Sequence, residues 1–155
     1  MSHYEERLER DLDRIRSEVG KLAQRVETAV RHSIHAVLTG DQALASATIL
    51  ADGHINRAMR QIDGLCHSFV AVHLPSAGHL RLISSIIRTN IILERIGDYA
   101  VTISRELSQL SEPPRGRIAR GIEVMAADVR AMLHQSVEAF EAGNAELARG
   151  TMTMA

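Results

Sequence analysis

Apolar and small residues recur along the first forty residues at alternating steps of four and three, the spacing of one buried face of an α-helix. The series predicts one long helix that ends near Thr39. There Gly40 can adopt the left-handed conformation of a helix C-terminus, and Asp41 can cap the helix that follows. The residues of this face are Leu8, Leu12, Ile15, Val19, Leu22, Val26, Ala29, Ser33 and Ala36.

Three further series of the same kind predict three more helices. The second helix stops before Pro75, because proline disfavours helix for the residue that precedes it. The third begins near Ser76 and breaks at Ser111-Glu112-Pro113-Pro114, and a fourth follows this break. Their predicted faces are Ala51, Ile55, Ala58, Ile62, Leu65, Phe69 and Val72; then Leu82, Ile86, Leu93, Ile96, Ala100, Ile103 and Leu107; and then Ile118, Ile122, Met125, Val129, Met132, Ser136 and Ala139.

Short links between long helices force neighbouring helices to run antiparallel, which predicts an all-α, up-and-down bundle. Only 3% of the residues are aromatic and there are few Gly or Pro breaks. This composition argues against a β-sandwich, a barrel or a Rossmann sheet. Separate coiled coils are the alternative, and the short turns favour the bundle.

The fourth predicted helix also repeats the first. A shift of 103 residues, the separation of Leu22 from Met125, aligns the two apolar series and places Gly143-Asn144 on Gly40-Asp41. The sequence therefore reads as about one and a half copies of a helical unit. Any two heptad helices align in some register, but the matching turns favour a true repeat.

Composition indicates which cellular compartment and which class of partner to expect. The 155 residues carry a formal charge of -1 with a pI near 6.7, so no general field attracts nucleic acid. Cys66 has no partner for a disulfide, and there is neither a signal peptide nor a run of 18 apolar residues. We expect a cytoplasmic protein that is not inserted in the membrane.

Two pairs of oxygen-bearing side chains are the candidates for chemistry. Glu94 and Asp98 lie on adjacent turns of the third helix, beside its apolar face, and Asp52 and Asn56 have the same spacing on the second. Antiparallel packing can bring the two pairs together. Such oxygens suit Mg, Ca, Mn, Fe or Zn ions, although spacing of this kind is also common on solvated helix faces.

Known catalytic patterns are missing. A ferritin-like di-iron centre needs Glu-x-x-His elements, and no glutamate here has a histidine three residues later. His32 and His35 have the spacing of an ion-binding pair but fit the rim of a bundle better, and Cys66 fits a small core position. None of these side chains therefore predicts a catalytic centre.

The segment Leu93–Val101, LERIGDYAV, resembles the L-E-R-I-G-D-H-A-V signature of the PhoU family of phosphate-uptake regulators. Gly40-Asp41, Asp52 with Ile55-Asn56, and the segment 74–81 resemble further elements of that family in the same order. The resemblance implies a complete three-helix repeat over residues 1–112 and the start of a second, truncated repeat over residues 113–155.

The resemblance also implies a function, that of a regulator that is not an enzyme. PhoU-like proteins couple a phosphate ABC transporter, through its nucleotide-binding subunit, to a sensor histidine kinase, and they negatively regulate phosphate uptake and the phosphate-starvation response. By position, the implied ligands of a divalent or trivalent metal ion (Fe, Zn, Mn or Mg) are Glu94, Asp98, Asp52 and Asn56. An exposed strip would dock partners directly or through bridging ions, and it comprises Ile87, Ile91, Glu94, Asp98 and Val101.

Two alternatives from other classes remain open. The first is a metal-binding or metal-storage bundle in which the ion is the function. The second is a structural helical protein that associates with itself, without a role in phosphate signalling. Under each of these readings, including the phosphate regulator, the apolar face of the fourth helix must cover either the first bundle or another chain, and of these outcomes we expect a homodimer.

Overall fold

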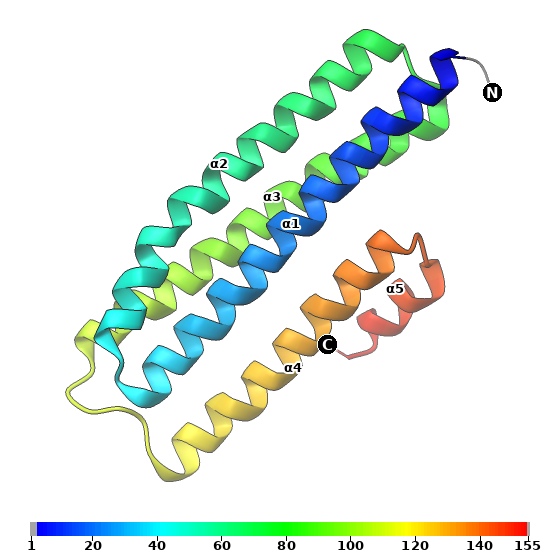
Figure 1. The fold of residues 1–155 in the computed structure, drawn as a ribbon. Helices are drawn as coiled ribbons and strands as arrows, with labels where there is room; N and C mark the ends of the chain where they lie inside the picture. Colours follow the sequence, from blue (N-terminus) through cyan, green and yellow to red (C-terminus); the bar gives the residue numbers. More distant parts are fainter. Residues whose placement is uncertain (1–2, 155) are drawn as a thin grey trace.

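A computed structural model describes residues 3–154, and within this range the chain is wholly helical (Figure 1). The prediction of an all-α bundle is therefore confirmed. The elements are α1 (His3–Thr39), α2 (Gln42–His73), α3 (Ala77–Glu106), the short 3-10 helix η1 (Leu107–Gln109), α4 (Gly116–Glu141) and α5 (Ala145–Met152).

Helices α1, α2 and α3 form an antiparallel bundle around one core (Figure 1). Every residue of the predicted α1 face is buried, from Leu8 to Ala36. Leu22 of α1, Ile62 of α2 and Ile86 of α3 are each at most 1% exposed within this core. Each of the three helices contacts the other two, and α1 with its strict heptad pattern also contacts α4.

The α2 face differs from its prediction. Val72 is 54% exposed, and Leu65 only half-buried, whereas Cys66 and His73 are buried. At 100° per residue, position i+4 departs from the buried direction by 40° and position i+3 by 60°. The core therefore takes Cys66 and His73, four residues after Ile62 and Phe69, in place of the neighbours three residues after them.

Both ends of α2 carry the predicted signals. Asp41 caps the N-terminus, where its Oδ1 accepts a hydrogen bond of 2.9 Å from the backbone N–H of Leu44. Gly40 has φ of +75° in the preceding turn, and Leu74 ends α2 in a left-handed conformation just before Pro75.

The buried face of α2 also differs from its prediction near the N-terminus of the helix. Ala51, predicted on the buried face, is exposed, while Thr48 is buried.

Helix α4 packs along α1, and α5 folds back on α4 (Figure 1). The predicted α4 face is largely uncovered, since Ile118, Met125 and Val129 are 69%, 61% and 50% exposed. The prediction of a buried face is wrong for most of its residues, because α4 meets the bundle along one side, through Leu133, Val137 and Phe140. None of the described helices is long and apolar enough to cross a membrane.

Candidate functional site

Gly97 allows α2 to approach α3 closely at the predicted acidic site. A methyl group built on Gly97 would lie 3.2 Å from Cδ1 of Ile55 and 4.0 Å from Oδ1 of Asp52. Any larger side chain at this position would push α2 away. The missing side chain therefore lets Asp52 lie against α3, between the turns that carry Glu94 and Asp98.

The charges of two neighbouring carboxylates act on Glu94. Burial, followed by the negative charges of Asp98 and Asp52, raises the pKa of Glu94, and the nearby Arg95 opposes this shift in part. The sequence predicts Asp52 beside Glu94 and Asp98 across two antiparallel helices. In the structure, Oδ1 of Asp52 lies 4.0 Å from the place of a methyl group on Gly97, the residue between Ile96 and Asp98.

Among the described residues, only one of the two carboxylate oxygens of Asp52 has a hydrogen-bond partner. Its Oδ2 accepts a hydrogen bond of 2.6 Å from the side-chain amide of Asn56. Its Oδ1 is buried and has no hydrogen-bond partner within the described chain. A buried carboxylate oxygen without a partner is unfavourable by about 1–3 kcal/mol or more, so this atom is suited to a donor or a cation from outside.

The residues present fit an open metal site rather than a closed one. Across residues 3–154, no three His, Cys, Asp or Glu side chains are arranged so that they could hold an ion by themselves. Asp52, Glu94 and Asp98 offer carboxylate oxygens, and Asn56 offers an amide oxygen, which are the hard ligands that Mg²⁺ and Mn²⁺ prefer. Water or a partner would have to complete the coordination.

The predicted docking strip on α3 is interrupted. Ile91 is 50% exposed, but Ile87 packs against the core and Val101 is only 7% exposed. Val101 lies four residues after Gly97 and so shares the face of α3 that is buried against α2. The exposed part of the strip is therefore limited to Ile91 and Asp98, with Glu94 half-buried between them.

The comparisons with known proteins bear on this same region. The model of the PhoU domain matches residues 19–107, which include Asp52, Asn56, Glu94 and Asp98. The chain belongs to the PhoU family. The family match thus contains α2, α3 and most of α1, while α4 and α5 lie outside it.

Individual PhoU proteins extend the similarity over most of the chain. The phosphate-specific transport system accessory protein PhoU homolog of Pseudomonas aeruginosa is 33% identical over 94% of this chain and 61% of its own length. PhoU of Escherichia coli K12 is 31% identical over 84% of this chain and 54% of its own. This PhoU-family chain therefore spans about three-fifths of the length of such relatives.

A solved structure gives the same result for the fold. The crystal structure of PhoU from Pseudomonas aeruginosa matches with a TM-score of 0.86 and 33% identity, over 92% of this chain and 68% of that one. The similarity therefore covers α4 as well as the three-helix bundle of the PhoU domain.

Sequence reasoning missed a polar cluster at the opposite end of the three-helix bundle. The side chain of His73 is 1% exposed, its Nε2 lies 2.8 Å from Oδ2 of Asp11, and its Nδ1 is buried without a partner in the described residues. Tyr4 donates a hydrogen bond to the backbone carbonyl of His73, and Phe69 packs against its ring. His73 lies seven residues after Cys66 on the same helix, and this spacing was the signal that could have predicted its burial.

Proposed function

We propose that this chain is a regulatory accessory protein of phosphate uptake that acts in the cytoplasm and is not an enzyme. In this role it couples the nucleotide-binding subunit of a phosphate ABC transporter to a sensor histidine kinase, and it represses phosphate uptake and the starvation response when phosphate is plentiful. The observation that carries the proposal is its 33% identity, over 94% of the chain, to a protein named as an accessory of the phosphate-specific transport system.

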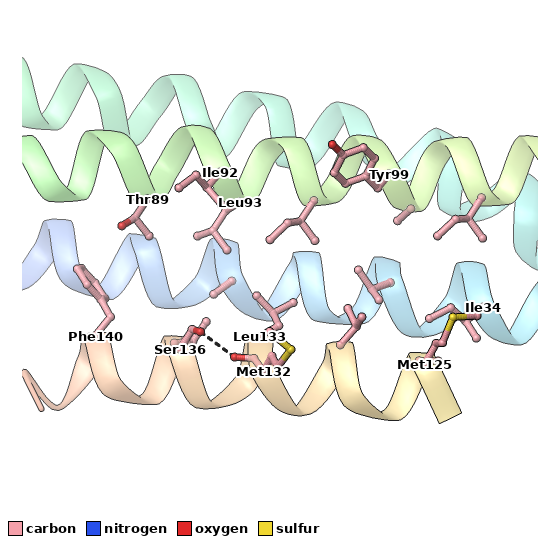
Figure 2. Close-up of a pocket in the computed structure, with 18 of the residues that line it drawn as sticks. Ile34, Thr89, Ile92, Leu93, Tyr99, Met125, Met132, Leu133, Ser136 and Phe140 are labelled. Carbon is pink, nitrogen blue, oxygen red and sulfur yellow. Dashed lines mark hydrogen bonds between the residues drawn. The ribbon is translucent and has the colours of Figure 1, made fainter. Parts of the chain in front are cut away.

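The arrangement of the site supports an adaptor over a catalyst. An apolar groove runs between α3 and α4 over α1 (Figure 2), and the acidic residues Asp52, Glu94 and Asp98 do not line it. Asp98 instead is exposed on α3, and the half-buried Glu94 lies between it and the exposed Ile91. A rigid helical surface of this kind offers charge and apolar contact to a protein partner.

The test is a reporter of a phosphate-starvation promoter in cells that lack the chromosomal gene. In high phosphate, expression of this chain should restore repression, and the double variant Asp52→Asn, Glu94→Gln should restore less. Asp13→Asn is the control, since Asp13 is exposed on α1, away from the site. Full derepression in the presence of the folded wild-type chain would show that the regulatory proposal is wrong.

We propose further that Asp52, Asn56, Glu94 and Asp98 bind a metal ion such as Fe, Zn, Mn or Mg. The buried, unpartnered Oδ1 of Asp52 and the mutual repulsion of the carboxylates support this assignment. A cation would supply positive charge to offset that repulsion and could bridge to acidic groups of a partner.

Manganese is the probe for this second proposal. Addition of Mn²⁺ at pH 7 should raise the melting temperature of the wild type and bind stoichiometrically in electron paramagnetic resonance titrations. The Asp52→Asn, Glu94→Gln variant should lose both responses, and Asp13→Asn should retain them. Equal binding by all three proteins, or none by the wild type, would exclude a metal site at these residues. The regulatory proposal would survive that result.

A further inference from the structure

A polar pocket with a volume of about 400 Å³ lies between α1 and α4. Pockets of about 300–1,000 Å³ are typical of small-molecule sites. The polar side chains that line it are Glu27, Thr28 and Arg31 of α1 and Arg130 and His134 of α4. The pocket therefore brings charged groups from two distant parts of the chain around one space, away from the acidic site of α2 and α3.

Two contacts define how the antiparallel helices α1 and α4 are aligned (Figure 1). The Nδ1 atom of His134 lies 3.4 Å from Oε1 of Glu27. Seven residues earlier on α1 and seven residues later on α4, a methyl group on Gly20 would collide with the carboxylate of Glu141. Both contacts have the same register, so the residues that face each other can be read along the two helices.

This register places two arginines opposite each other. Arg31 follows Glu27 on α1 by four residues, about one turn, and Arg130 precedes His134 on α4 by the same number. Both arginines line the pocket, both are exposed, and neither has an ion pair among the described residues. Like charges that face each other repel, and an anion between them would replace this repulsion by attraction.

The groups around the two arginines suit a phosphate ion. Guanidinium groups bind phosphate oxygens through paired, charge-assisted hydrogen bonds. The hydroxyl of Thr28 lines the same pocket and has no hydrogen bond to another described residue. It is therefore available to donate a hydrogen bond to the same ion.

Glu27 determines which oxyanion the pocket favours. It is the acidic member of the described lining, and apart from the contact of its Oε1 with His134 it has no hydrogen bond or ion pair in residues 3–154. At neutral pH inorganic phosphate keeps at least one proton, which a carboxylate can accept in a hydrogen bond. Sulfate has no proton to donate, so Glu27 repels it.

We infer that the pocket between α1 and α4 binds inorganic phosphate. Arg31 and Arg130 hold the ion from both sides, Thr28 donates to it, and Glu27 accepts its proton. The inference goes beyond the proposed regulation and does not depend on it. Phosphate binding without repression in the reporter assay would exclude the regulation and keep the site, and repression without phosphate binding would do the opposite.

Isothermal titration calorimetry of the purified chain with potassium phosphate, in a chloride buffer at pH 7.5, is the test. We expect saturable binding at one site per chain. Arg31→Gln and Arg130→Gln should each weaken it about tenfold or more, because each removes a charged donor. Circular dichroism verifies that the variants stay folded, since both side chains lie at the surface.

Arg120→Gln is the matched control for the loss of charge. Arg120 is exposed on α4, does not line the pocket, and precedes Arg130 by ten residues, about 15 Å along the helix. In salt of about 0.1 M this distance exceeds the screening length of about 10 Å. The control should therefore change the affinity for phosphate less than about twofold.

Titrations with sulfate and with ATP identify the anion. The wild type should bind phosphate about tenfold more tightly than sulfate, since only phosphate can donate to Glu27. Glu27→Gln should remove most of this preference by strengthening the binding of sulfate. Glu123→Gln, at an exposed position of α4 outside the pocket, should leave the preference unchanged.

Four results would overturn the inference. The first is no saturable binding up to about 10 mM phosphate, well above the range of a weak specific ligand. The second is binding that Arg31→Gln and Arg130→Gln leave unchanged, or that Arg120→Gln weakens equally. The third is equal affinity of the wild type for phosphate and sulfate. The fourth is tighter binding of ATP than of inorganic phosphate, because the ligand would then be a nucleotide.

Discussion

The Nε2 atom of His73 lies 2.8 Å from Oδ2 of Asp11, so a buried side chain at the end of α2 is tied to the first half of α1. Asp11→Ala leaves this imidazole nitrogen buried without a partner. We expect the free energy of unfolding to fall by about 1–3 kcal/mol in urea denaturation. Asp13→Ala, which removes only an exposed pair with Arg16, should change it by no more than about 0.5 kcal/mol. Equal losses in the two variants would contradict this role of His73.

The raised pKa of Glu94 predicts a pH-dependent effect of its removal. The folded protein holds this proton more tightly than the unfolded chain, so the group stabilises the fold at low pH and loses that contribution as pH rises through the folded pKa. Glu94→Gln should therefore stabilise the protein at pH 7, by about 0.2–0.5 kcal/mol for relief of the pair with Asp98.

Below the ordinary pKa of glutamate the gain should disappear, because wild-type Glu94 is then protonated as well. Urea denaturation at pH 3 and pH 7 measures the difference. Glu123→Gln, an exposed position on α4, is the control and should show no such dependence. A variant that is less stable than the wild type at pH 7 would mean that ionised Glu94 has a favourable partner.

The contact between Gly97 and Ile55 predicts that a side chain at position 97 separates α2 from α3. Gly97→Val should destabilise the fold by about 1–3 kcal/mol through overpacking. The pKa of Glu94, followed by carboxyl NMR, should fall toward its ordinary value as Asp52 moves away. Gly64→Val is the control, since a side chain there meets nothing within 4 Å. An unchanged pKa of Glu94 in Gly97→Val would show that Gly97 does not set the distance to Asp52.

Cys66 should be inert in the folded protein. Burial, with a smaller contribution from Asp63, raises the pKa of its thiol from 9.0 to about 11. The thiolate is the reactive form, so at pH 8 this shift alone slows alkylation by iodoacetamide about 100-fold. A cysteine placed at the exposed position 68, in a Cys66→Ala background, should react rapidly. Similar rates at the two positions would place Cys66 at the surface.

Two glycines in equivalent turns allow the energetic cost of backbone strain to be distinguished from the cost of overpacking. Gly40 and Gly143 have φ of +75° and +60°, but only a methyl group on Gly40 would approach a neighbour, Cγ of Pro113, at 2.7 Å. Gly143→Ala should lower the free energy of unfolding by about 1–2 kcal/mol, because alanine disfavours the left-handed conformation. Gly40→Ala should lower it by about 1–3 kcal/mol more, because the added methyl group also meets Pro113. Melting temperatures of the two variants test this order. Equal melting temperatures would show that the link between α3 and α4 does not pack against the turn between α1 and α2.

The sequence predicted the helices and their turns because each depends on neighbours within a few residues. Gly40 and Asp41 specify a helix end and a cap whatever the rest of the chain does. The LERIGDYAV segment of α3 was enough to identify the family, since it is a continuous stretch of one helix. The antiparallel order followed from the short links alone.

By itself, then, the sequence determined the number, length and order of the long helices and the buried face of α1. The tertiary structure decided which partners the other helices meet. It joined His73 to Asp11 across 62 residues, brought Asp52 to Glu94 at the narrow contact of Gly97, and left Met125 and Val129 of α4 open. Periodicity fixes which side of a helix is apolar, but the rotation and distance of one helix relative to another depend on side-chain packing between distant segments.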